Sequence, residues 1–211
     1  MTKFKNLIVL GPLVYALHHF EEHIIFNFRE WRLTYFSDNN SIPTEAVLVI
    51  LISQLLILIF IHLIKNDRGS AHLVLFFLMT TQVVNAFFHI FFSFYFNDFS
   101  PGAITAVLLY LPINALIIRA AFHEGYLKSF LELFFVFFAG SMTFALFEMI
   151  GAQVLGYAVL LMPIYYILIK KIEEKPKVGC CGGVGGGGGS SCGTTKSDES
   201  SSPIMAKVTK I

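Results

Sequence analysis

"AVLVILISQLLILIFIHLI", residues 46–64, contains no charged side chain and only three polar ones. A helix of about 20 such residues crosses the roughly 30 Å hydrocarbon core of a bilayer. Similar runs recur along the chain, which is 55% hydrophobic and 15% aromatic, with a mean hydropathy of +0.70. A soluble domain of 211 residues does not carry so much apolar surface. The sequence therefore predicts an integral, multi-pass membrane protein of the all-α class.

The apolar runs divide into about six predicted transmembrane spans in one helical bundle over residues 1–174. Short polar linkers rich in Asn, Asp, Ser, Pro and Gly separate most of the runs. The first run lacks a small-x-small cleavage pattern, so we interpret it as a retained span and not as a cleaved leader. The predicted spans cover residues 6–28, 43–64, 71–96, 102–122, 129–150 and 152–170.

No polar linker separates the last two predicted spans. Helix length and the distribution of basic residues nevertheless both favour two spans over one long helix. A single helix over 129–170 would be roughly 60 Å long at about 1.5 Å per residue, so we expect a break near residues 148–156. With six spans, one side of the membrane receives only Arg29 and Arg32. The opposite side, which is also the side of both termini, receives Lys3, Lys5, Lys65, Arg68, Arg119, Lys128, Lys170, Lys171, Lys175 and Lys177. Because basic residues favour the cytoplasmic side, both termini are expected to be cytoplasmic.

Residues 175–211 differ sharply in composition from the predicted bundle. Runs of Gly and Ser bury too little apolar surface to offset the entropy of ordering, so we predict a disordered cytosolic tail. All three cysteines lie in this tail, at Cys180, Cys181 and Cys192. An odd number in a cytosolic tail argues against structural disulfides. Acylation of Cys180 and Cys181 and an unmodified thiol pair both stay open.

The first predicted span contains "ALHHFEEHII", residues 16–25, with three histidines and two glutamates. A charged group near the bilayer centre costs on the order of 2.5–3.5 kcal/mol on insertion scales. On a helix, His18, Glu21 and Glu22 fall within about 100° of arc. Imidazole and carboxylate groups at i, i+3 and i+4 have the spacing with which one helix offers two ligands to a metal ion. An interfacial band of charges and a hydrogen-bond network that only joins helices are the alternatives.

The predicted topology brings further polar residues to the depth of this cluster. Spans one, three and five run in the same direction, so His89 and Asn85 of span three lie near the level of residues 18–23. Glu148 reaches the same side at the end of span five. These residues are therefore candidates to join the cluster.

At these residues the chain resembles the HXXEE family of small membrane proteins. The resemblance covers about residues 8–125 and includes a later histidine, matched by His89. It also includes a Tyr-x-Pro-Gly turn, for which this chain has Phe99-Ser100-Pro101-Gly102, with Phe in place of Tyr. The resemblance implies that one unit is formed by His18, Glu21, Glu22 and His89, and it implies no substrate.

The leading hypothesis is a metal site that acts on a lipid-soluble substrate. The predicted ligands are His18, Glu22 and His89, two imidazoles and a carboxylate that suit zinc or iron. Glu21 is the predicted general base for a metal-bound water. Behind the ligands, as supporting or proton-relay groups, we expect His19, His23, Asn85 and Glu148. Hydrolysis and oxidation both stay open, as does the choice between His18 and His19 as ligand.

Two other functions stay open at this stage. Chains of intramembrane His and Glu residues serve proton- or metal-coupled transporters, but the sequence lacks an apparent two-fold repeat. A non-catalytic scaffold or binding protein would need the polar network only to hold its helices together. The net charge of +1 gives no reason to expect nucleic acid as a partner, and the sequence does not predict an oligomeric state.

Overall fold

The computed structural model describes residues 3–37 and 42–174. The predicted tail, residues 175–211 with Cys180 and Cys181, lies outside the described residues. Within the described ranges every regular element is helical and no strand occurs, which confirms the predicted all-α class.

Among the described residues, five helical stretches are long and apolar enough to cross a membrane. The first and the last two are the single helices α4 (Thr44–Lys65), α9 (Phe130–Ile150) and α10 (Gln153–Glu174). The stretch Arg68–Tyr95 joins α5 (Arg68–Leu78), the π-helical segment η2 (Met79–Val84) and α6 (Asn85–Tyr95). The stretch Ala103–His123 joins α7 (Ala103–Thr105), the π-helical segment η3 (Ala106–Tyr110) and α8 (Leu111–His123). Their positions agree with five of the six predicted spans.

The first predicted span, 6–28, is less regular than expected. It consists of α1 (Phe4–Ile8), α2 (Leu10–Phe20) and the π-helical segment η1 (Glu21–Ile25), with a turn at Val9. Pro12 explains the turn, because a proline ring clashes with the carbonyl four residues earlier, here that of Ile8. The helix also ends at Ile25, three residues before the predicted end.

A short helix that the sequence analysis missed, α3 (Phe28–Tyr35), follows this segment. Its N-cap is Asn27, whose side-chain oxygen accepts a hydrogen bond from the backbone N–H of Glu30 at 3.2 Å. The Asn27 amide in turn donates to the Glu30 carboxylate at 3.1 Å. A cap residue followed three positions later by Glu is a start signal for a helix. The helix lies beside the candidate site and supplies part of its wall.

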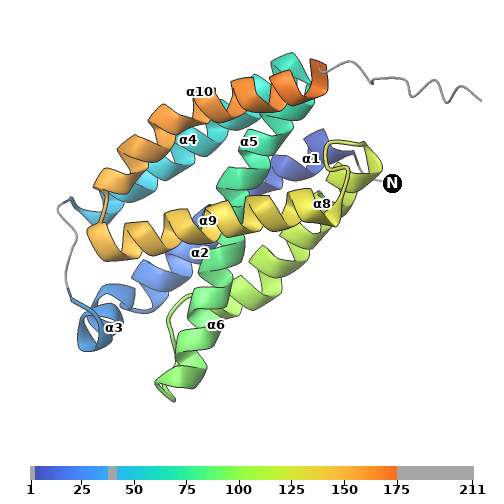
Figure 1. Cartoon of the computed structure of the whole chain (residues 1–211). Coiled ribbons are helices and arrows are strands. Elements are labelled where there is room, and N and C mark those ends of the chain that lie inside the picture. Colours follow the sequence, from blue (N-terminus) through green and yellow to red (C-terminus); the bar gives the residue numbers. More distant parts are fainter. Residues whose placement is uncertain (1–2, 38–41, 175–211) are drawn as a thin grey trace, which may run out of the picture. The chain divides into compact units, whose positions relative to one another are not determined.

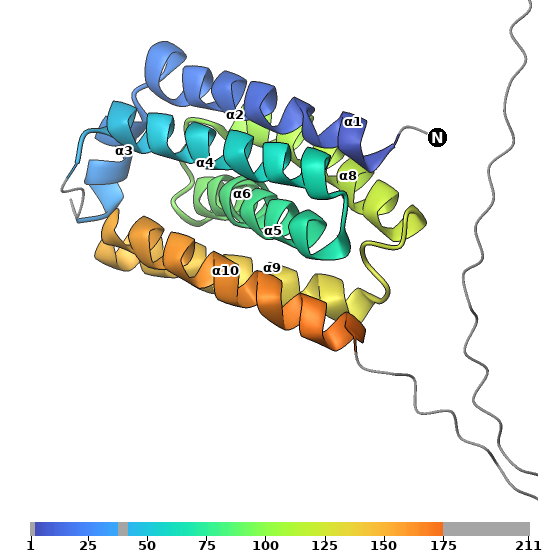
Figure 2. The same ribbon diagram turned by 90° about the horizontal axis from the view of Figure 1, so that it is seen from above.

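The stretch from α5 to α6 is the centre of the helical assembly. In its apolar part 56% of the residues are buried, against 28% in α4 and 6% in α10. Figure 2 shows α5 and α6 between α9 and α10 on one side and α1, α2, α4 and α8 on the other. The main core cluster packs Leu55 of α4, Leu75 and Leu78 of α5 and Ile117 of α8 together.

The predicted break between the last two spans lies at Gly151. This glycine ends α9 with a φ of 95°, a conformation that favours glycine, and α10 begins two residues later. Figure 1 shows the chain reversing there, so that α10 runs back from the end of α9 and diverges from it. The break falls within the predicted range 148–156.

The outward faces of the long helices carry large apolar side chains. Phe60 is 64% exposed, Phe130 80% and Leu160 71%. Water-soluble proteins seldom expose apolar surface on this scale, so this surface is compatible with a lipid environment.

Candidate metal centre

The candidate site lies where the first helical segment meets α6 and the turn before α7. His18 is on α2, Glu22 on η1 and His89 on α6, and these residues are 1%, 7% and 0% exposed. Ionisable groups buried to this extent require partners or a bound ion. The structure thus brings together the three residues predicted as ligands.

Each of the three π-helical segments in the described part of the chain adjoins this site. Glu22 belongs to η1, η2 ends at the residue before Asn85, and η3 begins at the residue after Thr105. π-Helical turns are rare and are frequent at functional sites. Three of them around one cluster indicate that the helices are adapted to the positions of these side chains.

The ligand-type atoms of His18, Glu22 and His89 converge. Oε1 of Glu22 lies 3.3 Å from Nε2 of His18 and 3.0 Å from Nε2 of His89, and the ligand atoms of the three residues lie within 4.8 Å of one another. In a tetrahedral site with bonds of about 2.1 Å, two ligand atoms are separated by about 3.4 Å. The two separations from Oε1 of Glu22 are close to this value, the one to His89 being somewhat shorter.

Hydroxyl groups hold the far side of both imidazole rings. Nδ1 of His18 lies 2.8 Å from Oγ1 of Thr105, and Nδ1 of His89 lies 2.9 Å from Oγ of Ser100. Thr105 donates its own proton to the carbonyl of Gly102, so its oxygen accepts from Nδ1–H of His18. Nε2 of His18 is then the acceptor nitrogen, and it lies 3.0 Å from Nδ2 of Asn85 and 3.3 Å from Oε1 of Glu22. A hydrogen bond from the far ring nitrogen to an oxygen is the usual support of a metal-bound histidine.

Nε2 of His89 is a buried polar atom that lacks a hydrogen-bond partner among the described residues. It lies 3.0 Å from Oε1 of Glu22, but not in the direction of a hydrogen bond. A buried imidazole nitrogen without a partner is costly, and a cation between it and the carboxylate would relieve this cost. The donor set and its geometry therefore fit a divalent metal.

Asn85 and Glu148, the other candidates from later spans, have different surroundings. Nδ2 of Asn85 lies 3.0 Å from Nε2 of His18, so Asn85 is part of the cluster. Glu148 instead accepts hydrogen bonds from Arg32 of α3, at 3.2 Å from Nε and 3.0 Å from Nη2. The proposed supporting role of Glu148 stays a prediction, and its contact with Arg32 joins α3 to α9.

Both carboxylate oxygens of Glu21 bind the turn that precedes α7. Oε1 accepts from the backbone N–H groups of Gly102 and Ile104 at 3.2 and 3.1 Å, and Oε2 accepts from that of Thr105 at 2.7 Å. Glu21 thus caps the start of the fourth predicted span, where N–H groups lack helical partners. Its predicted role as a general base is untested, but these contacts favour a role in positioning.

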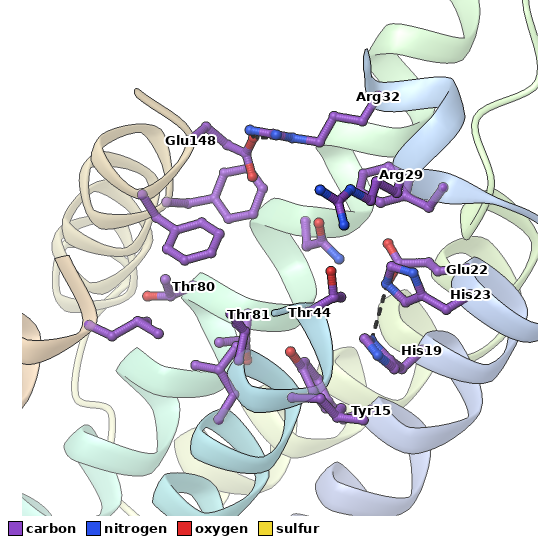
Figure 3. Close-up of a pocket in the computed structure, with 18 of the residues that line it drawn as sticks. Tyr15, His19, Glu22, His23, Arg29, Arg32, Thr44, Thr80, Thr81 and Glu148 are labelled. Carbon is purple, nitrogen blue, oxygen red and sulfur yellow. Dashed lines mark hydrogen bonds and ion pairs between the residues drawn. The ribbon is translucent and has the colours of Figure 1, made fainter. Parts of the chain in front are cut away.

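A second group of ligand-type atoms consists of His19, Glu22 and His23, again within 4.8 Å of one another. The imidazole rings of His19 and His23 lie 4.1 Å apart between their centroids. All three residues line a cavity of about 150 Å³, whereas His18 and His89 do not. Figure 3 shows His19 and His23 along one wall of this cavity and the contact between Arg32 and Glu148 at its end.

The cavity has a mixed lining. Apolar side chains from α4, α9 and α10 include Leu48, Phe144 and Leu155, and hydroxyl groups come from Thr80 and Thr81 of η2. Arg29 and Arg32 of α3 lie at one end, where Arg32 is paired with Glu148. A lining of this kind suits a largely apolar molecule with a polar or anionic end.

Sequence reasoning missed several residues of the site. Thr105 and Ser100 carried no signal of their own, although both flank the Pro-Gly turn that the sequence analysis did identify. Tyr110 is fully buried, and its ring packs against that of His18 in a tilted arrangement with centroids 4.3 Å apart. One feature of the sequence pointed to the contact between Arg32 and Glu148, because the predicted topology placed both residues on the same side of the membrane.

Comparison with known proteins gives one result. Residues 9–117 match the model of a family described as "Protein of unknown function with HXXEE motif". None of the curated proteins matches the chain, and none of the solved structures does. The matched range contains His18, Glu21, Glu22, His89 and the Pro-Gly turn, and it ends within α8.

Proposed function

This chain belongs to the HXXEE family, and we propose that it is a multi-pass membrane enzyme with a metal centre that acts on a lipid-soluble molecule. The metal is held by His18, Glu22 and His89. The proposal rests above all on one observation. Two Nε2 atoms and one carboxylate oxygen converge in a buried place, while hydroxyl groups hold Nδ1 of both rings.

The proposed topology has six spans with both termini in the cytoplasm. The segment Phe4–Ile25 supplies the first span, in addition to the five long helical stretches. With this topology the basic residues that follow α4 and α8 lie on the cytoplasmic side, in keeping with the distribution of Lys and Arg in membrane proteins. The metal centre then lies toward the other side of the membrane.

The ligand set narrows the chemistry to two classes. Two imidazoles and one carboxylate hold zinc in hydrolytic enzymes and iron in oxygenases. Bound at such a site, the metal supplies Lewis acidity and a reactive water in the first class, or oxygen activation in the second. The protein positions the ligands through Thr105 and Ser100 and closes His18 and His89 off from the cavity.

The cavity beside the centre supports the choice of a lipid-soluble substrate. Its walls include Leu48 and Phe144, which offer apolar contacts, and the arginines of α3 lie near one end. An apolar molecule would pack against these walls with its polar group toward Glu22. Water-filled access is not needed for a substrate that is dissolved in the bilayer.

The test is the metal content of the full chain, purified in detergent without chelators and measured by elemental mass spectrometry. We expect zinc or iron in the parent protein and in His123→Ala, a matched control at an exposed histidine of α8. His18→Ala and Glu22→Ala should lose it while they elute as folded protein in size-exclusion chromatography. A folded parent protein without metal would overturn the proposal. The metal found then selects hydrolase or oxygenase assays.

A further inference from the structure

The two carboxylate oxygens of Glu22 face two different pairs of histidines. Oε1 lies 3.3 Å from His18 and 3.0 Å from His89. Oε2 lies 3.7 Å from Nδ1 of His19 and 3.7 Å from Nε2 of His23. The carboxylate therefore stands between two sets of imidazole ligands.

We propose that Glu22 bridges two metal ions, and that the second ion, held by His19, Glu22 and His23, is the one that meets the substrate. This inference rests on the proposed function, since it extends the same centre. It changes the role of His19 and His23 from supporting groups to ligands.

The spacing in the second group argues for a bound ion over direct hydrogen bonds. At 3.7 Å, the imidazole nitrogens are too far from Oε2 to form hydrogen bonds with it. The same distance is close to the separation of about 3.4 Å between two ligands of one tetrahedral ion. His19 and His23 are also four residues apart, the spacing with which one helix face offers two imidazoles to a metal.

Exposure separates the roles of the two ions. The side chains of His18 and His89 are 2% and 0% exposed, whereas those of His19 and His23 are 16% and 21% exposed. Closed metal sites are typical of structural ions, and catalytic ions keep a position open to substrate. The cavity adjoins the second group and not the first, so the substrate reaches the ion at His19 and His23.

The charge of the two proposed ions indicates which ligands fill the coordination positions that the protein leaves open. Two divalent cations carry more positive charge than one carboxylate neutralises, and uncompensated charge is costly away from water. The open positions must therefore hold anionic oxygen, from hydroxide or from a carboxylate or phosphate group of the substrate.

The competing role for His19 and His23 is that of a proton relay beside a single ion. The two roles differ in the number of ions bound, which does not depend on knowledge of the substrate. Magnetic coupling also distinguishes them, because two paramagnetic ions that share a carboxylate are coupled, whereas single ions are not.

The experiment uses the full chain in detergent, stripped with a chelator and titrated with Mn²⁺ as the probe. Bound metal is measured after desalting, and the loaded protein is examined by electron paramagnetic resonance at low temperature. We expect two equivalents and a coupled spectrum in the parent protein and in His123→Gln. The double variant His19→Gln/His23→Gln should bind one equivalent with an uncoupled spectrum.

Each outcome separates this inference from the proposed function. One uncoupled equivalent in the parent protein, kept in His19→Gln/His23→Gln and lost in His89→Gln, would overturn the two-ion centre and leave the proposed function intact. One equivalent that is lost in the double variant but kept in His89→Gln would overturn the two-ion centre and the assignment of His89 as a ligand, and the single ion would then belong to His19 and His23. No bound metal in the folded parent protein, with Mn²⁺ or with Zn²⁺ titrated in the same way, would overturn both proposals. Because the parent protein alone reports the number of ions, a variant that fails to fold does not prevent the test.

Discussion

Gly102 lies directly against His18, so that a Cβ atom at position 102 would come within 2.8 Å of Cε1 of His18. The same Cβ would lie 2.9 Å from Cγ of Glu22 and 3.0 Å from Cε1 of His89. Gly102 also has a φ of 97°, which a residue with a side chain adopts only with strain. The glycine of the Pro-Gly turn is thus a wall of the candidate site, and the turn does more than connect two helices.

We therefore expect Gly102→Ala to disrupt metal binding. The positive φ alone costs roughly 1–2 kcal/mol, and the new methyl group must also displace the ligands. Metal content and the thermal unfolding midpoint in detergent are the measurements. Gly125→Ala is the matched control, because Gly125 has a φ of 77° but an added Cβ would meet no atom within 4 Å. If the two variants lost stability equally and both kept metal, close packing at Gly102 would not matter.

Thr105 offers a test of ligand orientation. Thr105→Val keeps the shape of the side chain but removes the oxygen that accepts from Nδ1 of His18. Loss of such a support lowers metal affinity by about 10–100-fold, which competition with a chromophoric chelator would measure. Thr105→Ser should restore most of the affinity.

The control for Thr105→Val is Thr143→Val. Thr143 lines the cavity, and its hydroxyl donates within α9 to the carbonyl of Ala139, away from the metal ligands. We expect the metal affinity of Thr143→Val to match that of the parent protein. An equal loss in both valine variants would mean that the hydroxyl of Thr105 has no special role.

The features that sequence reasoning predicted were those that depend on helix period and span direction. The apolar runs set the positions of α4, α9 and α10, because lipid requires long, uninterrupted apolar helices. His18 and His89 lie 71 residues apart, yet parallel spans and similar depth were enough to predict that they meet.

The features that it missed depend on contacts between side chains and backbone. The sequence does not distinguish the roles of the adjacent glutamates Glu21 and Glu22. Only the structure shows that Glu21 binds the turn while Glu22 faces the histidines. Ser100 and Thr105 are ordinary turn residues until the position of each imidazole ring is known. The helix α3 was overlooked because an eight-residue polar helix lacks the apolar length that identified the others.

Asp67 provides a pH test outside the spans. Burial alone would raise the pKa of this carboxyl group, but hydrogen bonds from Ser70 and Tyr166, together with the nearby Lys170, bring the pKa below its ordinary value of 3.8. A depressed pKa means that the ionised group stabilises the fold at higher pH. This contribution is lost as the pH falls below 3.8 through the folded-state pKa.

Asp67→Asn should therefore be less stable than the parent protein at pH 7, and the difference in unfolding midpoint should shrink below about pH 4. Thermal unfolding in detergent from pH 7 to pH 3 would measure this. Glu45→Gln, in the exposed first turn of α4, controls for the removal of one acidic group. A constant difference between Asp67→Asn and the parent protein at every pH would contradict the assignment.

The variant Glu21→Gln distinguishes a positioning role of Glu21 from its predicted role as a general base. Hydrogen bonds to a charged group contribute about 1.5–3 kcal/mol each, and the carboxylate accepts three from the turn. The amide of Gln keeps one oxygen and turns an NH₂ group toward N–H donors. We expect the free energy of unfolding to fall by about 2 kcal/mol or more, while the folded protein keeps its metal. Glu45→Gln, in the exposed first turn of α4, should cost much less. Unchanged stability in Glu21→Gln, with loss of activity once a substrate is known, would instead support the general base.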